Sequence, residues 1–288
     1  MSRNHSLCIV DAEEGCELDY SAAYQAVAGY LRSGSAVVYA AENMPPEETL
    51  NNLSKVTNID PEIYAKNGAL TIIKYDALYN KGLDSKNLIK RWQSEIRKKQ
   101  KKEYKQVLIV DTCKAFTDAG NYHGLLDYEY AKKDALSPLS SSTAAATAAF
   151  TSYSYATTTV EWVCCFDSSA INRMPSMPIL ASILFSHDSK VARAGREEES
   201  IVQPLYPGQM RELIRESIDD ILGQGTCDLI IKTMKLVYHL EEETVTRRPQ
   251  LFADTLGKIV GKSAASTVLI NALNKMKERT IKDQIITL

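Results

Sequence analysis

The stretch KQVLIVDT, residues 105–112, decides the fold class. Its residues Val107–Val110 are consecutively apolar and mostly β-branched, which is typical of a strand that is covered on both faces in a parallel sheet. The run ends in Asp111, and a carboxylate at the end of such a strand holds the magnesium ion in the Walker B element of P-loop proteins. The stretch therefore predicts an α/β protein and raises the question of nucleotide binding.

Similar apolar runs occur on both sides of this stretch, separated by longer segments with helical periodicity. We expect strands at Leu7–Val10, Ala36–Ala41, Leu70–Tyr75, Val107–Val110 and Val160–Phe166. The run Ile179–Phe185 fits either a strand or a buried helix that ends near His187. Because strands alternate with helices, the pattern predicts a mostly parallel sheet flanked by helices.

Helices are clearest at Ser21–Arg32 and at Ser85–Glu103, where Ser85 is suited to be the N-cap. From about Pro207 the periodicity becomes purely helical. We therefore expect an α/β domain over residues 1–205 and a small all-α domain over residues 206–288. The polar segment REEESIVQPLYPGQ, residues 196–209, is interpreted as the linker between them.

Charge and composition exclude several classes of function. The 288 residues carry a formal net charge of −2, and from Gly208 onward 12 Lys and Arg face 11 Asp and Glu. A nucleic-acid partner is therefore disfavoured, because binding phosphates takes clustered cations. The basic run Arg97–Lys105 fits a solvated helix end, where cations complement the helix dipole. The sequence shows neither a signal peptide nor an apolar window of about 18 residues, so we expect a cytoplasmic protein with no membrane partner.

The cysteines and histidines show no motif of a metal or catalytic site. Since none of the six cysteines forms part of a paired CxxC set, we expect buried thiols of a reducing compartment, no zinc and no cofactor. The histidines are far apart in the sequence, and ordinary structural roles are expected for them, with His187 kept open as a group that can titrate near neutral pH. These residues are Cys8, Cys16, Cys113, Cys164, Cys165, Cys227, His5, His123, His187 and His239.

A phosphate-binding loop is missing where Asp111 would need one. The segment after the first strand, CIVDAEEGCELDYSAA at residues 8–23, has one glycine, no lysine and several carboxylates that would repel a triphosphate. The segment GKIVGKSAAS at residues 257–266 imitates the end of a Walker A motif, but Leu256 stands where that motif needs glycine. We interpret Gly261 as a turn between helices. The sequence therefore predicts that the chain neither binds nor hydrolyses ATP.

The first roughly 205 residues resemble the MEDS family, a sensory domain of methanogens and methylotrophs that is related to the KaiC and RecA ATPases. The resemblance rests on strand and turn patterns and implies a RecA-like fold without a working P-loop. The Ser/Thr/Ala-rich segment 137–159 departs from the family pattern and fits either a helix or a long loop. The matching stretches are HSLCIVDAEEG (5–15), SAVVYAAEN (35–43), GALTIIKYDALY (68–79), VLIVDT (107–112), WVCCFD (162–167) and ILFSHD (183–188).

The last roughly 80 residues, above all LFADTLGKIVGKSAASTVLINAL at 251–273, look like the helical output domains of archaeal KaiC-like signalling proteins. Together the two resemblances imply a non-catalytic sensor that binds a small ligand or a signalling protein and relays its state through the tail. A degenerate KaiC-like ATPase, a sensory transcription regulator and an adaptor that self-associates through its tail stay open as alternatives.

A ligand of such a sensor is expected at the carboxyl ends of the parallel strands, where open α/β sheets form their crevices. Several carboxylates would converge there, which favours a cationic or hydrogen-bond-donating ligand, or a bound metal ion, over a nucleotide. The candidate ligand-binding residues are Asp11, Glu42, Tyr75, Asp111, Asp167 and His187. Each of them also fits a cap or hinge role, and no catalytic residue is assigned.

Overall fold

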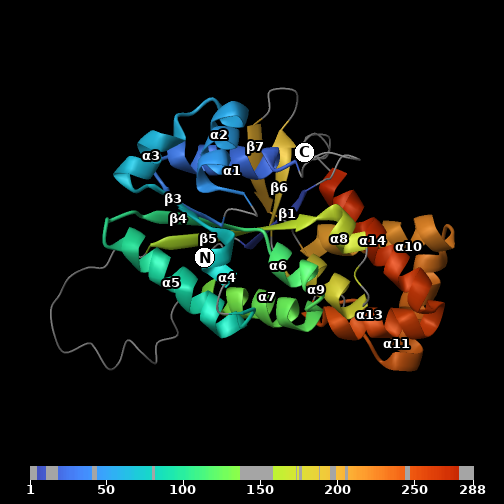
Figure 1. Cartoon of the computed structure of the whole chain (residues 1–288). Helices are drawn as coiled ribbons and strands as arrows, with labels where there is room; N and C mark the ends of the chain where they lie inside the picture. The colour runs from blue at the N-terminus through green and yellow to red at the C-terminus, as the bar shows by residue number, and fades with distance from the viewer. Residues whose placement is uncertain are drawn as a thin grey trace, which may run out of the picture.

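A seven-stranded sheet forms the centre of the molecule (Figure 1). The structure is a computed structural model and describes residues 5–10, 19–40, 44–79, 82–136, 158–172, 174, 177–187, 189–194, 199–204, 207–243 and 247–278. The strands lie in the order β3-β2-β4-β5-β1-β6-β7. All neighbours are parallel except β6 and β7, which pair antiparallel. The strand bounds are β1 His5–Val10, β2 Ala36–Ala40, β3 Leu70–Ile73, β4 Gln106–Asp111, β5 Thr159–Asp167, β6 Ser189–Ala194 and β7 Glu199–Pro204.

Helices cover both faces of the sheet, so the predicted α/β class is confirmed. On one face lie α1 (Ser21–Arg32), α2 (Pro46–Thr57) and α3 (Pro61–Asn67) (Figure 1). The opposite face carries α4 (Tyr75–Tyr79), α5 (Ser85–Gln100), α6 (Lys114–Asp118), α7 (Tyr122–Leu136) and α9 (Met177–Ser186). The short helix α8 (Ser168–Asn172) follows β5 directly.

The two faces have separate apolar cores, because side chains alternate along each strand. On β5, Cys164 packs into the core under α5, α7 and α9, and Cys165 packs into the core under α1 and α2. Trp92 of α5 and Trp162 of β5 are buried in the first core with their rings 5.8 Å apart.

The C-terminal part is helical, as predicted. It consists of α10 (Pro207–Leu222), α11 (Thr226–Tyr238), α13 (Pro249–Val260) and α14 (Lys262–Glu278). Both α13 and α14 pack against α9, so the core beneath the sheet continues into these helices. Gly261, at φ 88°, lies in the turn between α13 and α14 as expected. The boundary between a domain over 1–205 and one over 206–288 stays a prediction.

The structure corrects several details of the sequence analysis. The run Ile179–Phe185 lies in helix α9, and β3 ends at Ile73 so that Tyr75 begins α4. The N-cap of α5 is Asp84, whose carboxylate accepts hydrogen bonds from two backbone N–H groups. Residues 137–157 of the Ser/Thr/Ala-rich segment 137–159 lie outside the described residues.

Residues 199–204 form strand β7, so the interpretation of this part of the segment 196–209 as a linker is wrong. Its sequence ESIVQP is polar at both ends, and β7 is an antiparallel edge strand, which tolerates such a pattern better than a central parallel strand does. The preceding strand β6 was not predicted either, because its sequence SKVARA mixes polar and apolar residues.

Among the described residues, no helix has the length and apolar character that crossing a membrane requires.

Candidate functional site

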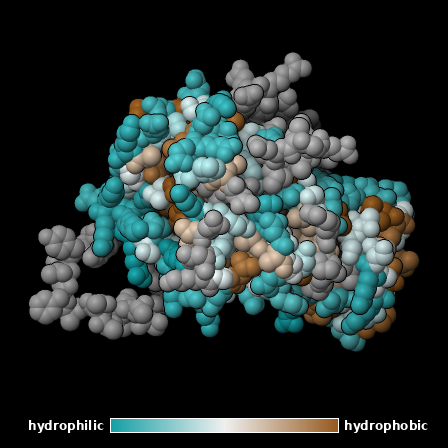
Figure 2. Space-filling view, viewed as in Figure 1, coloured by the Kyte–Doolittle hydropathy of each residue, from teal (hydrophilic) through white to brown (hydrophobic). Residues whose placement is uncertain are grey.

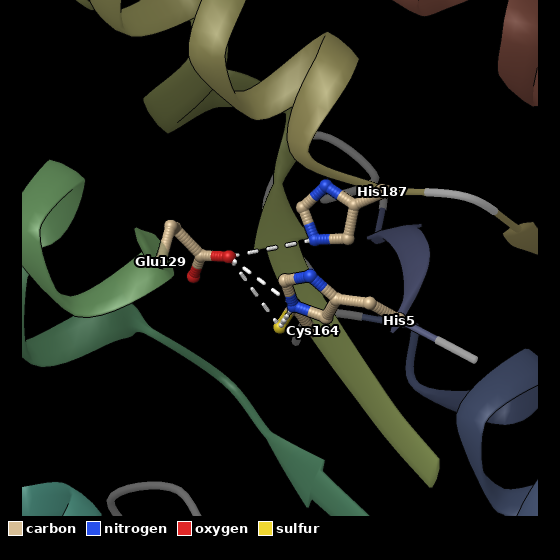
Figure 3. A group of neighbouring side chains, drawn as sticks. All are labelled: His5, Glu129, Cys164 and His187. Carbon is tan, nitrogen blue, oxygen red and sulfur yellow. Dashed lines mark hydrogen bonds and ion pairs between the residues drawn. The ribbon is translucent and has the colours of Figure 1, made fainter. Parts of the chain in front are cut away.

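Four side chains that carry metal-binding or acid–base groups meet beneath the sheet, on the face covered by α7 and α9 (Figure 3). His5 begins β1, Cys164 lies in the middle of β5, Glu129 projects from α7, and His187 directly follows α9. All four are buried, and their potential ligand atoms lie within 4.8 Å of one another. We call these four residues the buried cluster.

One carboxylate oxygen lies at the middle of the buried cluster. Glu129 Oε2 is 3.4 Å from His5 Nε2, 3.6 Å from His187 Nε2 and 3.8 Å from Cys164 Sγ. His5 Nε2 is also 3.0 Å from Cys164 Sγ. The two imidazole rings lie with their centroids 4.2 Å apart. Figure 3 shows ring nitrogens of both histidines directed toward Glu129 and Cys164.

Lys132, one helical turn after Glu129 on α7, joins the buried cluster to the end of β4. Its fully buried ammonium is 2.8 Å from Glu129 Oε1 and 3.0 Å from Asp111 Oδ2. The same nitrogen is 3.0 Å from Cys113 Sγ and 3.2 Å from Cys164 Sγ. An ammonium without water needs such partners, because an unpaired buried charge is strongly unfavourable.

Asp111 faces protein groups on both of its carboxylate oxygens. The Tyr79 hydroxyl donates to Oδ1 at 3.0 Å, and the Tyr128 hydroxyl donates to Oδ2 at 2.7 Å. The Trp92 indole in turn donates to the Tyr128 hydroxyl at 2.6 Å. Cys113, two residues after Asp111, has φ 52°, a left-handed conformation that is uncommon outside glycine and is often found at functional sites. Asp111, which suggested a Walker B element, thus has both carboxylate oxygens hydrogen-bonded to tyrosine side chains of the protein.

The charges of this region depend on one another. Burial alone would raise the pKa of the Cys164 thiol, but its hydrogen bond with Cys113 and the charge of Lys132 hold that pKa well below its usual range. Burial would lower the pKa of His5, yet the Cys164 thiolate and Glu129 raise it to about 10. Burial also works against ionisation of Glu129, whose pKa is nevertheless lowered, chiefly by Lys132 and His5. The chemistry available is therefore that of a thiolate and carboxylates held close to imidazole and ammonium groups.

Only some of the six predicted ligand-binding residues come together. Asp111 and His187 belong to one network, linked through Lys132 and Glu129. Tyr75 lies near it, with its ring 4.8 Å from that of Tyr79. Asp167 accepts a hydrogen bond from the Ser169 backbone at the start of α8, which matches the cap role left open for it. Asp11 and Glu42 lie outside the described residues.

No sequence pattern identified Glu129, Lys132, Cys164 or the role of His5. Glu129 and Lys132 lie on a helix whose sequence YHGLLDYEYAKKDAL mixes polar and apolar residues without a clear stripe, so nothing marks them as buried. Cys164 lies inside an apolar run and was interpreted as a small core residue. The proximity of His5 and Cys164 follows only from the pairing of β1 with β5. A rule based on the spacing of residues along the chain does not include such a pairing.

Comparison with known families agrees with the N-terminal part of this fold. The family model described as MEDS, the MEthanogen/methylotroph, DcmR Sensory domain, matches residues 4–141. The match includes His5, Asp111, Glu129 and Lys132 and ends before Cys164 and His187. No curated protein matches the chain. Residues 4–141 of this chain are therefore similar to the MEDS family of sensory domains.

Proposed function

We propose that this protein is a non-catalytic sensor whose α/β part detects a small ligand or a partner and whose C-terminal helices relay the result. The similarity of residues 4–141 to a family of sensory domains supports the first half of the proposal. The relay rests on the position of helix α9, which lies between the buried cluster and the C-terminal helices. The RecA-like character implied by the MEDS resemblance belongs to the same proposal, and the mostly parallel sheet supports it.

Helix α9 contacts the buried cluster at its C-terminal end. His187 Nδ1 lies 2.7 Å from the backbone oxygen of Ile183, so the ring is held against the last turn of the helix. The same helix packs against α7, α13 and α14. A change of charge or geometry at Glu129 or His187 would therefore act on α9, and a packed helix transmits a shift to its neighbours because interiors are densely packed.

A second set of contacts, beside the first, links α7, α9 and α13. The Tyr130 hydroxyl, one residue after Glu129, lies 3.4 Å from Ser182 Oγ of α9. Gln250 of α13 donates to the Tyr130 hydroxyl at 3.1 Å and lies 3.5 Å from Ser182 Oγ. Three helices thus meet in one polar contact beside the cluster, which supports coupling between α7 and the C-terminal part.

The C-terminal helices offer a surface through which a protein could receive the signal. Leu229, Leu236 and Val237 of α11 are 65%, 76% and 63% exposed and share one helical face, since they are seven and eight residues apart. Figure 2 shows hydrophobic residues gathered over the C-terminal helices. Exposed apolar faces of this kind mark protein contacts more often than isolated apolar residues do. We infer that another protein or a second copy of the chain binds there, and not a nucleic acid.

The alternatives find less support. Both carboxylate oxygens of Asp111 have protein donors, which leaves this residue poorly placed to bind a magnesium–nucleotide complex. A transcription regulator that binds DNA through the tail would need a basic recognition helix, whereas α10 and α11 carry acidic and basic residues together.

Hydrogen exchange measured by mass spectrometry tests the relay in the full chain. Glu129→Gln removes the charge at the middle of the buried cluster, and Asp127→Asn removes an exposed charge from the same helix. We expect Glu129→Gln to change protection in α9 and α13 as well as in α7, because they share packed contacts. Helices α2 and α3, on the opposite face of the sheet, serve as the internal reference.

A change confined to α7 and the strands, with α9 and α13 unaffected, would refute the relay. An equal effect of Asp127→Asn would also refute it, because that residue lies away from the cluster. A thermal-shift screen of the full chain against cationic and hydrogen-bond-donating compounds then addresses the ligand, since a molecule that binds only the native state raises its stability.

A further inference from the structure

We propose that the buried cluster binds one Zn²⁺ ion through His5 Nε2, Glu129 Oε2, Cys164 Sγ and His187 Nε2. Four protein donors of types that zinc accepts converge here from four separate elements. The spacing rule used in the sequence analysis considers only residues close in the chain, and these four are brought together by the sheet. The proposal does not depend on the relay described above, because a zinc ion can be held with or without signalling.

The separations between the donor atoms suit a tetrahedral ion. Zinc bonds of about 2.0–2.3 Å at tetrahedral angles place neighbouring donors about 3.3–3.6 Å apart. Glu129 Oε2 lies 3.4, 3.6 and 3.8 Å from the donors of His5, His187 and Cys164. The His5–Cys164 pair, at 3.0 Å, would need to open by about half an ångström. His187 Nε2 lies within 4.8 Å of the donors of His5 and Cys164, so side-chain adjustments of up to about 1 Å would complete the coordination.

The charges around the donors favour a divalent cation. Coordination makes Cys164 a thiolate, so that Asp111, Glu129 and Cys164 then carry three negative charges. Lys132, which contacts all three, supplies one positive charge. An ion bound at His5 Nε2 takes the place of the proton on that nitrogen, so both imidazoles are then neutral. Asp111, Glu129, Cys164 and Lys132 together then carry a net charge of −2 in a buried environment, where uncompensated charge is costly. One divalent ion neutralises it.

The surrounding contacts orient the donors as outer-shell partners do in known zinc sites. A hydrogen bond from His187 Nδ1 to the Ile183 backbone oxygen leaves Nε2 as the nitrogen that can ligate. Lys132 donates to Glu129 Oε1 and so turns the other oxygen, Oε2, toward the histidines. It also donates to Cys164 Sγ. Partners of this kind fix the ring orientation and the lone-pair directions before an ion arrives.

The donor set selects zinc over other common ions. Calcium and magnesium prefer oxygen ligands, and here three of four donors are nitrogen or sulfur. Two histidines, a cysteine and a carboxylate fit a tetrahedral site for zinc. Because all four positions come from the protein, the site is closed in the manner of structural zinc sites, which retain the ion and stabilise the fold.

Metal content and cobalt spectroscopy of the full chain test the proposal. The chain is produced with added Zn²⁺, and its metal content is measured; the ion is then removed, Co²⁺ is bound, and absorption is recorded. We expect one zinc ion per chain and a cobalt–thiolate charge-transfer band. Added Zn²⁺ should raise the unfolding temperature of the stripped chain, since it binds the native state.

Matched variants assign the ligands. Cys164→Ser should abolish the thiolate band, whereas Cys165→Ser, at the next buried position on the other face of β5, should keep it. Loss of an outer-shell partner weakens metal binding about 10- to 100-fold. His187→Gln removes a ligand itself, so it should weaken zinc binding by more than this. His123→Gln, at an exposed position on α7, should leave binding unchanged. Circular dichroism checks that each variant is folded.

The wild-type measurements decide the question even where a variant fails to fold. A wild-type chain that retains no stoichiometric zinc and shows no cobalt–thiolate band would overturn the proposal, and the cluster would then be a network of proton-sharing groups without a metal. A band that survives Cys164→Ser and disappears in Cys165→Ser would overturn it as well.

Discussion

Lys132 is the residue on which the charge balance beneath the sheet depends. Its ammonium contacts two carboxylates and two thiol sulfurs and lies 4.2 Å from the centre of the Tyr128 ring. Despite burial, which favours the neutral amine, Asp111 and the neighbouring groups raise the pKa of Lys132 well above its usual value. The protein therefore keeps a full positive charge in a place that water does not reach.

We expect Lys132→Met to lower the free energy of unfolding by about 3–5 kcal/mol, because it leaves buried negative charges without their partner. Lys114→Met is the control, since Lys114 forms an ion pair with Asp118 near the surface and such pairs contribute about 0–1 kcal/mol. Urea denaturation of the full chain measures both. If both variants lost a similar, small free energy of unfolding, the buried network would not need the charge of Lys132.

At this scale the sequence singled out Asp111 and His187 as candidates, and it gave no sign of Glu129 and Lys132, which link them. Asp111 ends an apolar strand, and His187 ends an apolar run, so both have a local mark. Glu129 and Lys132 are charged residues on a helix, where exposure is the ordinary expectation. Their burial depends on α7 lying against β4 and β5, which are far from one another in the chain. A local sequence pattern does not show which distant segments of the chain pack against it.

At the scale of elements, α9 decides how the two parts of the chain are joined. Its sequence MPILASILFS is apolar nearly throughout, which made strand and helix equally plausible beforehand. A helix that is apolar on all sides is buried on all sides. Here one side lies against α7 and the other against α13 and α14. The strands β1 to β5 were easier to predict, because buried parallel strands have continuous β-branched runs.

A chain truncated after Pro204 tests this junction. We expect it to keep its sheet, to unfold at a lower temperature than the full chain and to bind a hydrophobic dye, because α9 loses the cover of α13 and α14. Thermal unfolding followed by circular dichroism, with dye fluorescence alongside, measures these effects. An unfolding temperature equal to that of the full chain would mean that the C-terminal helices contribute nothing to α9.

At the scale of the whole molecule, the question of nucleotide binding depends on the end of β4 and on the segment that follows β1. The end of β4 supplies Asp111, as a magnesium-binding strand would. The carboxylate oxygens of Asp111 accept hydrogen bonds from Tyr79 and Tyr128, and Lys132 balances its charge. Residues 11–18, where a phosphate loop would lie, contain four acidic residues and no lysine.

We therefore expect the full chain to show no binding of Mg-ATP by calorimetry at millimolar nucleotide and no release of phosphate. The physical reason is that a triphosphate would meet carboxylates where a P-loop offers backbone N–H groups and a lysine. Asp111→Asn should leave this result unchanged. A dissociation constant in the micromolar range for the wild-type chain that rises in Asp111→Asn would restore the ATPase interpretation.

The position of β1 in the middle of the sheet has a consequence for how the chain folds. β1 precedes the other described strands in the chain, and it pairs with β5 and β6, with His5 beside Trp162 and Ser6 beside Ser189. Neither edge of β1 can pair before β5 (Thr159–Asp167) and β6 (Ser189–Ala194) have been synthesised. Pairings between such distant segments slow folding and expose strand edges in the meantime. His5 therefore joins Cys164 and His187 only at a late stage of folding, after the sheet has closed around β1.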